Sequence, residues 1–177
     1  MQKIKRKIAK IQLLIARKLK LKCYMKLYNK YLKIAGVHLT GNVKFIHPSV
    51  HMDTGYAENL HLGDNFVVSV NSIILAHDYS LECGMASIGR GDLTNEKKFV
   101  RDVHIGNNVF IGAGCIVLPG ADIGDNCIIG AGVVCSGKIP ENSVIVGAEN
   151  RIIQNTKDWA YKKYYCAVDD VTNTNKE

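Results

Sequence analysis

The chain has 177 residues, of which 47% are hydrophobic and 22% are charged, so one folded domain with appendages is expected and intrinsic disorder is excluded. The formal net charge of +7 is unevenly distributed: residues 1–33 hold 12 Lys and Arg and no acidic residue, whereas residues 34–177 hold 11 basic and 16 acidic residues. A basic arm on an acidic domain argues against a nucleic-acid-binding domain and for an anionic surface met at one end. The sequence contains no run of 18 apolar residues, so a membrane-spanning helix is not expected.

The first segment, residues 1–35, is predicted to be a basic amphipathic helical arm that ends at Gly36. Large aliphatic residues recur at spacings of three and four and therefore share one helix face: Ile4, Ile8, Ile11, Ile15 and Leu19. Lysines and arginines fill the opposite face. Two interpretations stay open. The helix packs on its own domain with its charges in water, or it lies on an anionic membrane surface.

From residue 37 the pattern changes to a repeat of six residues. The clearest series is Ile105, Ile111, Val117, Ile123, Ile129 and Cys135. An earlier series has the same spacing at Val50, Tyr56, Leu62, Val68 and Ile74, with Val43 displaced by one residue. In an extended chain an even period returns each marked residue to one face, and three short strands joined by turns make a triangular coil. Stacked coils would bury the marked residues in one column, so an all-β core built as a parallel β-helix is predicted.

Residues 75–98 break the repeat with a polar stretch that contains several glycines, which predicts a loop extruded from the coil. After Ile145 the repeat decays, and a short helix around Trp159 followed by a polar tail is expected. The predicted organisation is a helical arm at 1–35, a β-helix domain at 36–155, and a C-terminal helix and tail at 156–177.

The six cysteines show no CxxC motif and no Cys/His spacing typical of zinc sites: Cys23, Cys83, Cys115, Cys127, Cys135 and Cys166. We therefore expect reduced thiols and no metal cofactor. The basic start is not followed by an apolar core and cleavage site of a signal peptide, so a cytoplasmic protein is expected.

The segment "VHIGNNVFIGAGCIVLPGADIGDNCIIGAGVVCSGKIP" closely resembles the hexapeptide-repeat acyltransferases. The resemblance covers about residues 40–153. It is nearest to the galactoside, maltose and xenobiotic O-acetyltransferases and to the acetyltransferases of capsule and lipopolysaccharide gene clusters. It implies a left-handed parallel β-helix, a homotrimer, and acetyl-CoA as co-substrate in a groove between two subunits.

The resemblance also implies roles for particular residues. In "ILAHDYS", His77 matches the catalytic base, and Asp78 is the candidate to orient its imidazole. Asn71 and Tyr79 are candidate contacts to the acceptor. Seven residues match the CoA-binding positions: Gly112, Ala113, Gly114, Ala131, Ser136, Lys138 and Arg151. Lys138 stands one position later than the lysine of the family's usual Thr-Lys-Asp-Ile-Pro segment.

The predicted function is transfer of acetyl from acetyl-CoA to a hydroxyl of a sugar or polysaccharide precursor. A neutral histidine suits the base that this reaction needs, and no covalent enzyme intermediate is required. Three alternatives stay open: an N-acetyltransferase acting on a sugar amine, a zinc-dependent β-helical carbonic anhydrase, and a non-catalytic repeat scaffold. The carbonic anhydrase needs three convergent histidines, but His47 and His51 are spaced His-x3-His and not His-x4-His. No nucleic-acid partner is expected.

Overall fold

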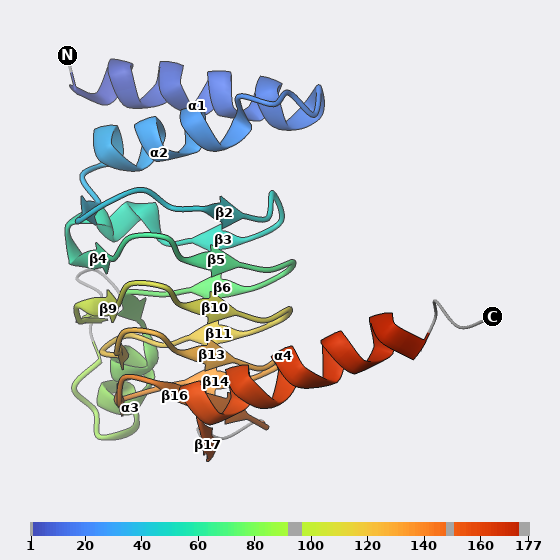
Figure 1. Ribbon diagram of the computed structural model, residues 1–177. Helices are drawn as coiled ribbons and strands as arrows, with labels where there is room; N and C mark the ends of the chain where they lie inside the picture. The colour runs from blue at the N-terminus through green and yellow to red at the C-terminus, as the bar shows by residue number, and fades with distance from the viewer. Residues whose placement is uncertain (1, 92–96, 148–150, 174–177) are drawn as a thin grey trace.

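A computed structural model describes residues 2–91, 97–147 and 151–173, and it places most of the chain in one column of triangular coils (Figure 1). Each full coil contributes one short strand to each of three parallel sheets. Sheet A has the order β1 (His38–Leu39), β4 (Leu60–Leu62), β9 (Val103–Ile105), β12 (Asp122–Ile123) and β15 (Lys138–Ile139). Sheet B has the order β2 (Phe45–Ile46), β5 (Val67–Val68), β10 (Phe110–Ile111), β13 (Ile128–Ile129), β16 (Ser143–Val146) and β17 (Arg151–Asn155). Sheet C has the order β3 (His51–Met52), β6 (Ile73–Ile74), β11 (Ile116–Val117) and β14 (Val134–Cys135).

Asparagines form the corners between sheets A and B. Asn65, Asn108, Asn126 and Asn142 all have positive φ, a conformation that asparagine tolerates better than most residues. Their side-chain amides are hydrogen-bonded from coil to coil, at 2.7 Å, 3.1 Å and 3.3 Å between successive pairs. Each corner therefore turns the chain and also ties one coil to the next.

The predicted inward column is confirmed in the second half of the coil, where every residue from Ile105 to Cys135 in the series is at most 2% exposed. In the first half Leu62, Val68 and Ile74 are buried as predicted, but the register predicted before Leu62 is wrong. Val50 and Tyr56 are half-buried, whereas Ile46 and Met52 point inward at 0% and 7% exposure. The difference arises in η1 (Thr54–Asn59), a 3-10 segment that adds residues to the corner between β3 and β4.

The N-terminal arm is a hairpin of two helices, α1 (Gln2–Lys18) and α2 (Tyr24–Ala35), and not one continuous helix. Lys20 adopts a positive φ of 50° in the connection. As predicted, Gly36 ends α2, with a φ of 98° that glycine adopts without strain. Helix α2 lies on the first coil and α1 lies outermost on α2 (Figure 1).

The stretch expected to be a loop also contains regular structure. β7 (His77–Asp78) pairs antiparallel with β8 (Phe99–Val100), and α3 (Ser80–Ser87) lies between them. At the far end of the column, β17 pairs antiparallel with β16 and leads into α4 (Thr156–Asn173), which is longer than the predicted short helix. In the described part of the chain, no helix has the length and apolar character to cross a membrane.

Candidate active site

His77 lies at the corner between sheets C and A, where the chain leaves the coil. It begins β7 and pairs in register with Val100 of β8. The preceding Ala76 is fully buried, and its carbonyl accepts a hydrogen bond of 3.0 Å from the backbone N–H of Arg101. The two ends of the insertion are thereby fastened beside the histidine, which holds the imidazole at a fixed point of the coil.

Asp53 orients His77 from the coil above. Its carboxylate accepts a hydrogen bond from the His77 Nδ1 and a second one of 3.2 Å from the backbone N–H of Ala76. Asp53 is only 6% exposed. A carboxylate can only accept here, so His77 carries its proton on Nδ1. The Nε2 lone pair is therefore available to a substrate hydroxyl.

Aromatic rings surround the imidazole. The Tyr56 ring lies 4.4 Å from it between centroids, and the Tyr79 ring meets it edge-on at 5.2 Å. The Lys98 ammonium lies over both tyrosine rings, 4.9 Å and 5.8 Å from their centroids. This places Tyr79, a predicted acceptor contact, beside the histidine.

Asp78 has a different role from the one expected. Its carboxylate is exposed and accepts hydrogen bonds from the backbone N–H and the hydroxyl of Ser80, at 2.7 Å and 3.0 Å. Those two bonds lower the pKa of the Asp78 carboxyl. Adjacent side chains of a strand project to opposite sides, so Asp78 turns away and caps the start of α3 while Asp53 holds His77.

Another corner, between sheets B and C, gathers most of the predicted CoA-binding positions. Gly114 donates its backbone N–H to the Val70 carbonyl above it at 2.9 Å, and Gly132 donates to the Ala113 carbonyl at 2.8 Å. Gly112 is packed so tightly that an added Cβ would lie 2.6 Å from the backbone nitrogen of Ala131. The small residues thus leave a smooth corner where a ligand can approach the backbone.

The chain is similar in sequence and in fold to known acetyltransferases. Residues 102–137 match the family model "Bacterial transferase hexapeptide (six repeats)". The chain is 31% identical over 139 residues to the galactoside O-acetyltransferase of Escherichia coli, covering 71% of this chain and 66% of that protein. It is 29% identical to the galactoside O-acetyltransferase of Lactococcus lactis, covering 66% of this chain and 58% of that protein. The solved maltose O-acetyltransferase of Clostridium difficile superposes with a TM-score of 0.59 at 25% identity, over 87% of each chain.

The chain belongs to the hexapeptide-repeat acyltransferase family. The left-handed coil expected above is the fold that this relationship implies. The chain spans about two thirds or less of the length of the two galactoside enzymes.

Of the remaining predicted residues, Asn71 shares the corner of Gly112, whereas Ser136 and Lys138 lie away from it. Asn71 lies at that corner, with a φ of 58° and its backbone N–H donating to Ser49 at 2.8 Å, and is therefore one strand away from His77. Ser136 lines a pocket of about 290 Å³ under the insertion, together with Arg101 and Pro119. Lys138 is exposed on sheet A, and the side chain of Arg151 lies outside the described residues. Within one chain, four of the predicted CoA positions thus share the corner between sheets B and C, whereas Ser136 and Lys138 lie elsewhere.

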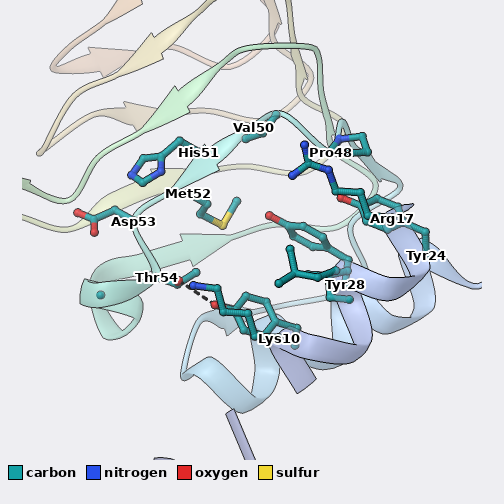
Figure 2. A pocket seen from close by; sticks show the side chains of 14 residues that line it. Lys10, Arg17, Tyr24, Tyr28, Pro48, Val50, His51, Met52, Asp53 and Thr54 are labelled. Carbon is teal, nitrogen blue, oxygen red and sulfur yellow. Dashed lines mark hydrogen bonds between the residues drawn. The ribbon is translucent and has the colours of Figure 1, made fainter. Parts of the chain in front are cut away.

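A second pocket, of about 260 Å³, lies between the helical hairpin and β3 (Figure 2). Lys10, Arg17, Tyr24, His51 and Asp53 contribute to its lining. Tyrosine rings suit the faces of a sugar, and the two cations suit an anionic group. Because Asp53 also binds His77, this pocket adjoins the histidine and is a candidate acceptor site of the hexapeptide-repeat acyltransferase.

Sequence reasoning missed Asp53, Tyr56 and Arg101. Asp53 follows the inward Met52, and Met52 pairs in register with Ile74, three residues before His77. The series through Ile46 and Met52 would have revealed that Asp53 and His77 occupy the same corner of successive coils. The alternative series through Val50 and Tyr56 concealed it.

Proposed function

We propose that this protein is an acetyl-CoA-dependent O-acetyltransferase that acetylates a hydroxyl of a sugar or polysaccharide precursor. The observation that carries the proposal is the buried Asp53 carboxylate hydrogen-bonded to His77 at the coil corner. The names of the relatives support acetyl transfer to oxygen. These names favour a hydroxyl as the acceptor. Asp53 and His77 could equally deprotonate a sugar amine.

The reaction follows from the hydrogen-bonding state of His77. Nε2 removes the proton of the acceptor hydroxyl while its oxygen attacks the thioester carbonyl carbon. A C–O bond forms, the C–S bond breaks, and the imidazolium returns its proton to the departing thiolate of CoA. Positive charge develops on the imidazole in the transition state, and the Asp53 carboxylate stabilises it.

We propose that the active site forms between subunits of a homotrimer. Phe45 and Phe110 on the outer face of sheet B are 40% and 43% exposed, as is Phe99 of β8 at 41%. Sheet C is also largely apolar outside, at Ile73, Ile116 and Val134, with His51 of β3 as the polar exception. Sheet A carries histidines, Asp122 and Lys138 instead. Packing of the apolar faces would bring the His77 corner of one subunit to the Ala113 and Ala131 corner of the next.

Activity and subunit mixing test this proposal. Release of the CoA thiol should depend on an acceptor sugar, and His77→Ala should lower kcat by about 10²–10⁴ with CoA affinity unchanged. Ala131→Trp should block CoA binding at the other corner. Co-expressing the two inactive variants should restore activity, because some interfaces then combine an intact His77 with an intact Ala131. Near-normal turnover of His77→Ala would refute the base, and failure of mixing to restore activity would refute the shared site.

The pocket of Figure 2 is proposed to hold the acceptor. Arg17→Gln is expected to raise the KM for an anionic acceptor tenfold or more, since a hydrogen bond to a charged group contributes about 1.5–3 kcal/mol. The KM for acetyl-CoA should not change. An equal rise in both constants would argue against this placement.

We also propose that the arm holds the protein on an anionic membrane surface, facing lipid-linked glycan precursors in the cytoplasm. Helix α1 packs on α2 through its small face, where Ala9, Leu13 and Ala16 are buried. The predicted apolar stripe remains exposed, at 51–64% for these residues: Ile4, Ile8, Ile11, Ile15 and Leu19. The 12 basic residues within positions 1–33 supply charge complementarity. A basic residue that lies close to an anionic surface contributes about 1 kcal/mol.

Vesicle flotation separates the contribution of the apolar stripe to membrane binding from that of the positive charge. Serine at Ile4, Ile8, Ile11 and Ile15 leaves the net charge unchanged, and serine at the equally exposed Ile152 and Ile153 of β17 is the matched control. Wild type and control should bind phosphatidylglycerol vesicles, less so as salt rises, and the arm variant should lose binding. If wild type ignores these vesicles at low salt, or if the arm variant binds equally well, the membrane proposal is wrong.

A further inference from the structure

Three histidines form a ladder on the outer face of sheet A. His38, His61 and His104 lie on the neighbouring strands β1, β4 and β9. His38 pairs in register with His61, and His61 pairs in register with His104. Their rings are stacked, at 4.7 Å between His38 and His61 and 4.5 Å between His61 and His104. The flanking residues of β4 and β9 are buried in the coil, so the rings are held on a rigid support.

A carboxylate completes a cluster beside this ladder. The Asp102 Oδ2 lies 3.8 Å from the His61 Nε2, and Asn59 donates a hydrogen bond of 2.7 Å to the other Asp102 oxygen. The possible ligand atoms of His61, Asp102 and His104 all lie within 4.8 Å of one another. The two histidines also line a groove of about 310 Å³ along sheet A. Oriented imidazoles with a hydrogen-bonded carboxylate are the arrangement that supports a metal ion.

We propose that His61, Asp102 and His104 bind a divalent transition-metal ion of the zinc type. Two imidazole nitrogens and one carboxylate oxygen match the ligands that Zn²⁺ takes, with water at the fourth position. The histidines must be neutral to bind.

The position of the cluster defines what the ion would do. β4 belongs to the coil before the insertion, and β9 begins the coil after it. Asp102 comes directly after two residues that fasten the insertion. Val100 of β8 pairs with His77, and the backbone N–H of Arg101 donates to the Ala76 carbonyl. An ion at this point joins the two coils at the base of the catalytic insertion. It therefore stabilises the corner of His77 without taking part in acyl transfer, and it lies on the polar sheet that the proposed trimer leaves in solvent.

Metal titration of the full-length, tag-free protein tests this site independently of any acetyl transfer. After treatment with a chelator, Zn²⁺ should bind by calorimetry at one ion per chain and raise the Tm. Co²⁺ should give the visible absorption of a four-coordinate nitrogen and oxygen site. His61→Ala and His104→Ala should each weaken Zn²⁺ affinity at least tenfold and abolish the rise in Tm. His47→Ala, at a histidine that follows β2 and is hydrogen-bonded to Ser49, is the matched control and should bind as wild type does.

The milder Asp102→Asn variant, which keeps the hydrogen bond from Asn59 available, should also weaken binding. Circular dichroism of each apo variant excludes loss of fold as the cause. Equal Zn²⁺ affinity in wild type and His61→Ala, or a stoichiometry that falls only in the His47 control, would overturn the assignment.

Discussion

Replacing Asp53 by Asn tests the link between the buried carboxylate and the chemistry. The side chain keeps its size and an oxygen that can accept the Ala76 N–H, but it loses the charge that faces the imidazolium in the transition state. For two unit charges about 4 Å apart, an effective dielectric constant of about 20 gives about 4 kcal/mol. The His77 side chain is 24% exposed, so solvent reduces this to about 2–4 kcal/mol. Because about 1.4 kcal/mol corresponds to a factor of ten, kcat should fall about 30-fold to 1,000-fold.

The matched variant is Asp78→Asn, which removes an exposed carboxylate bonded to Ser80. Steady-state kinetics with both substrates should show a fall in kcat for Asp53→Asn that is at least tenfold greater than that for Asp78→Asn. Calorimetry with CoA should show unchanged affinity in both, which excludes a general loss of structure. If Asp78→Asn proves the more damaging, or if Asp53→Asn keeps a third of wild-type kcat, the assignment of Asp53 is refuted.

Two further predictions concern the coil. Gly112→Ala should destabilise the protein by about 1–3 kcal/mol in urea unfolding, because the new methyl group meets backbone atoms of the next coil. Gly84→Ala in α3, where nothing lies within 4 Å, should be neutral or stabilising by about 0.5–1 kcal/mol, and equal losses would contradict the packing argument. For the thiols, burial raises the pKa of Cys115 and Cys127, and raises that of Cys135 to about 12, so these three should resist alkylation at pH 8. The exposed Cys23 and Cys83 should react, and mass spectrometry of modified positions would reveal any reversal of this order.

The sequence predicted the second half of the coil well because nothing interrupts its period. From Ile105 to Cys135 each side of the triangle has the same length, so the spacing of buried residues alone determines their direction. In the first half, η1 lengthens one corner. Two series of apolar residues, each with a spacing of six, then compete: one through Val50 and Tyr56, the other through Ile46 and Met52. Val50 and Tyr56 fit the later residues by spacing alone, but burial of Ile46 and Met52 determines the register.

The site was predictable only in part for a related reason. His77 stands at the visible break between repeat and insertion, whereas Asp53 is 24 residues away and meets it only through coil stacking. Asp78 is adjacent in sequence, but the alternation of a strand turns it away. The break at Lys20 was also hidden, because the apolar spacing of the arm continues on both sides of it.

The two ends of the column have a consequence for how the protein behaves in a crowded cell. A stack of parallel strands has unpaired peptide groups at its first and last coil, and such edges are templates for adding strands of another molecule. Here α2 covers the first coil: Asn29 donates to the Val43 carbonyl at 3.0 Å and accepts from its N–H at 2.8 Å. At the other end β17 runs antiparallel and breaks the repeat that a further coil would have to continue. The helical hairpin and the antiparallel strand thus prevent columns from associating end to end. A chain shortened to its coils alone should assemble into filaments.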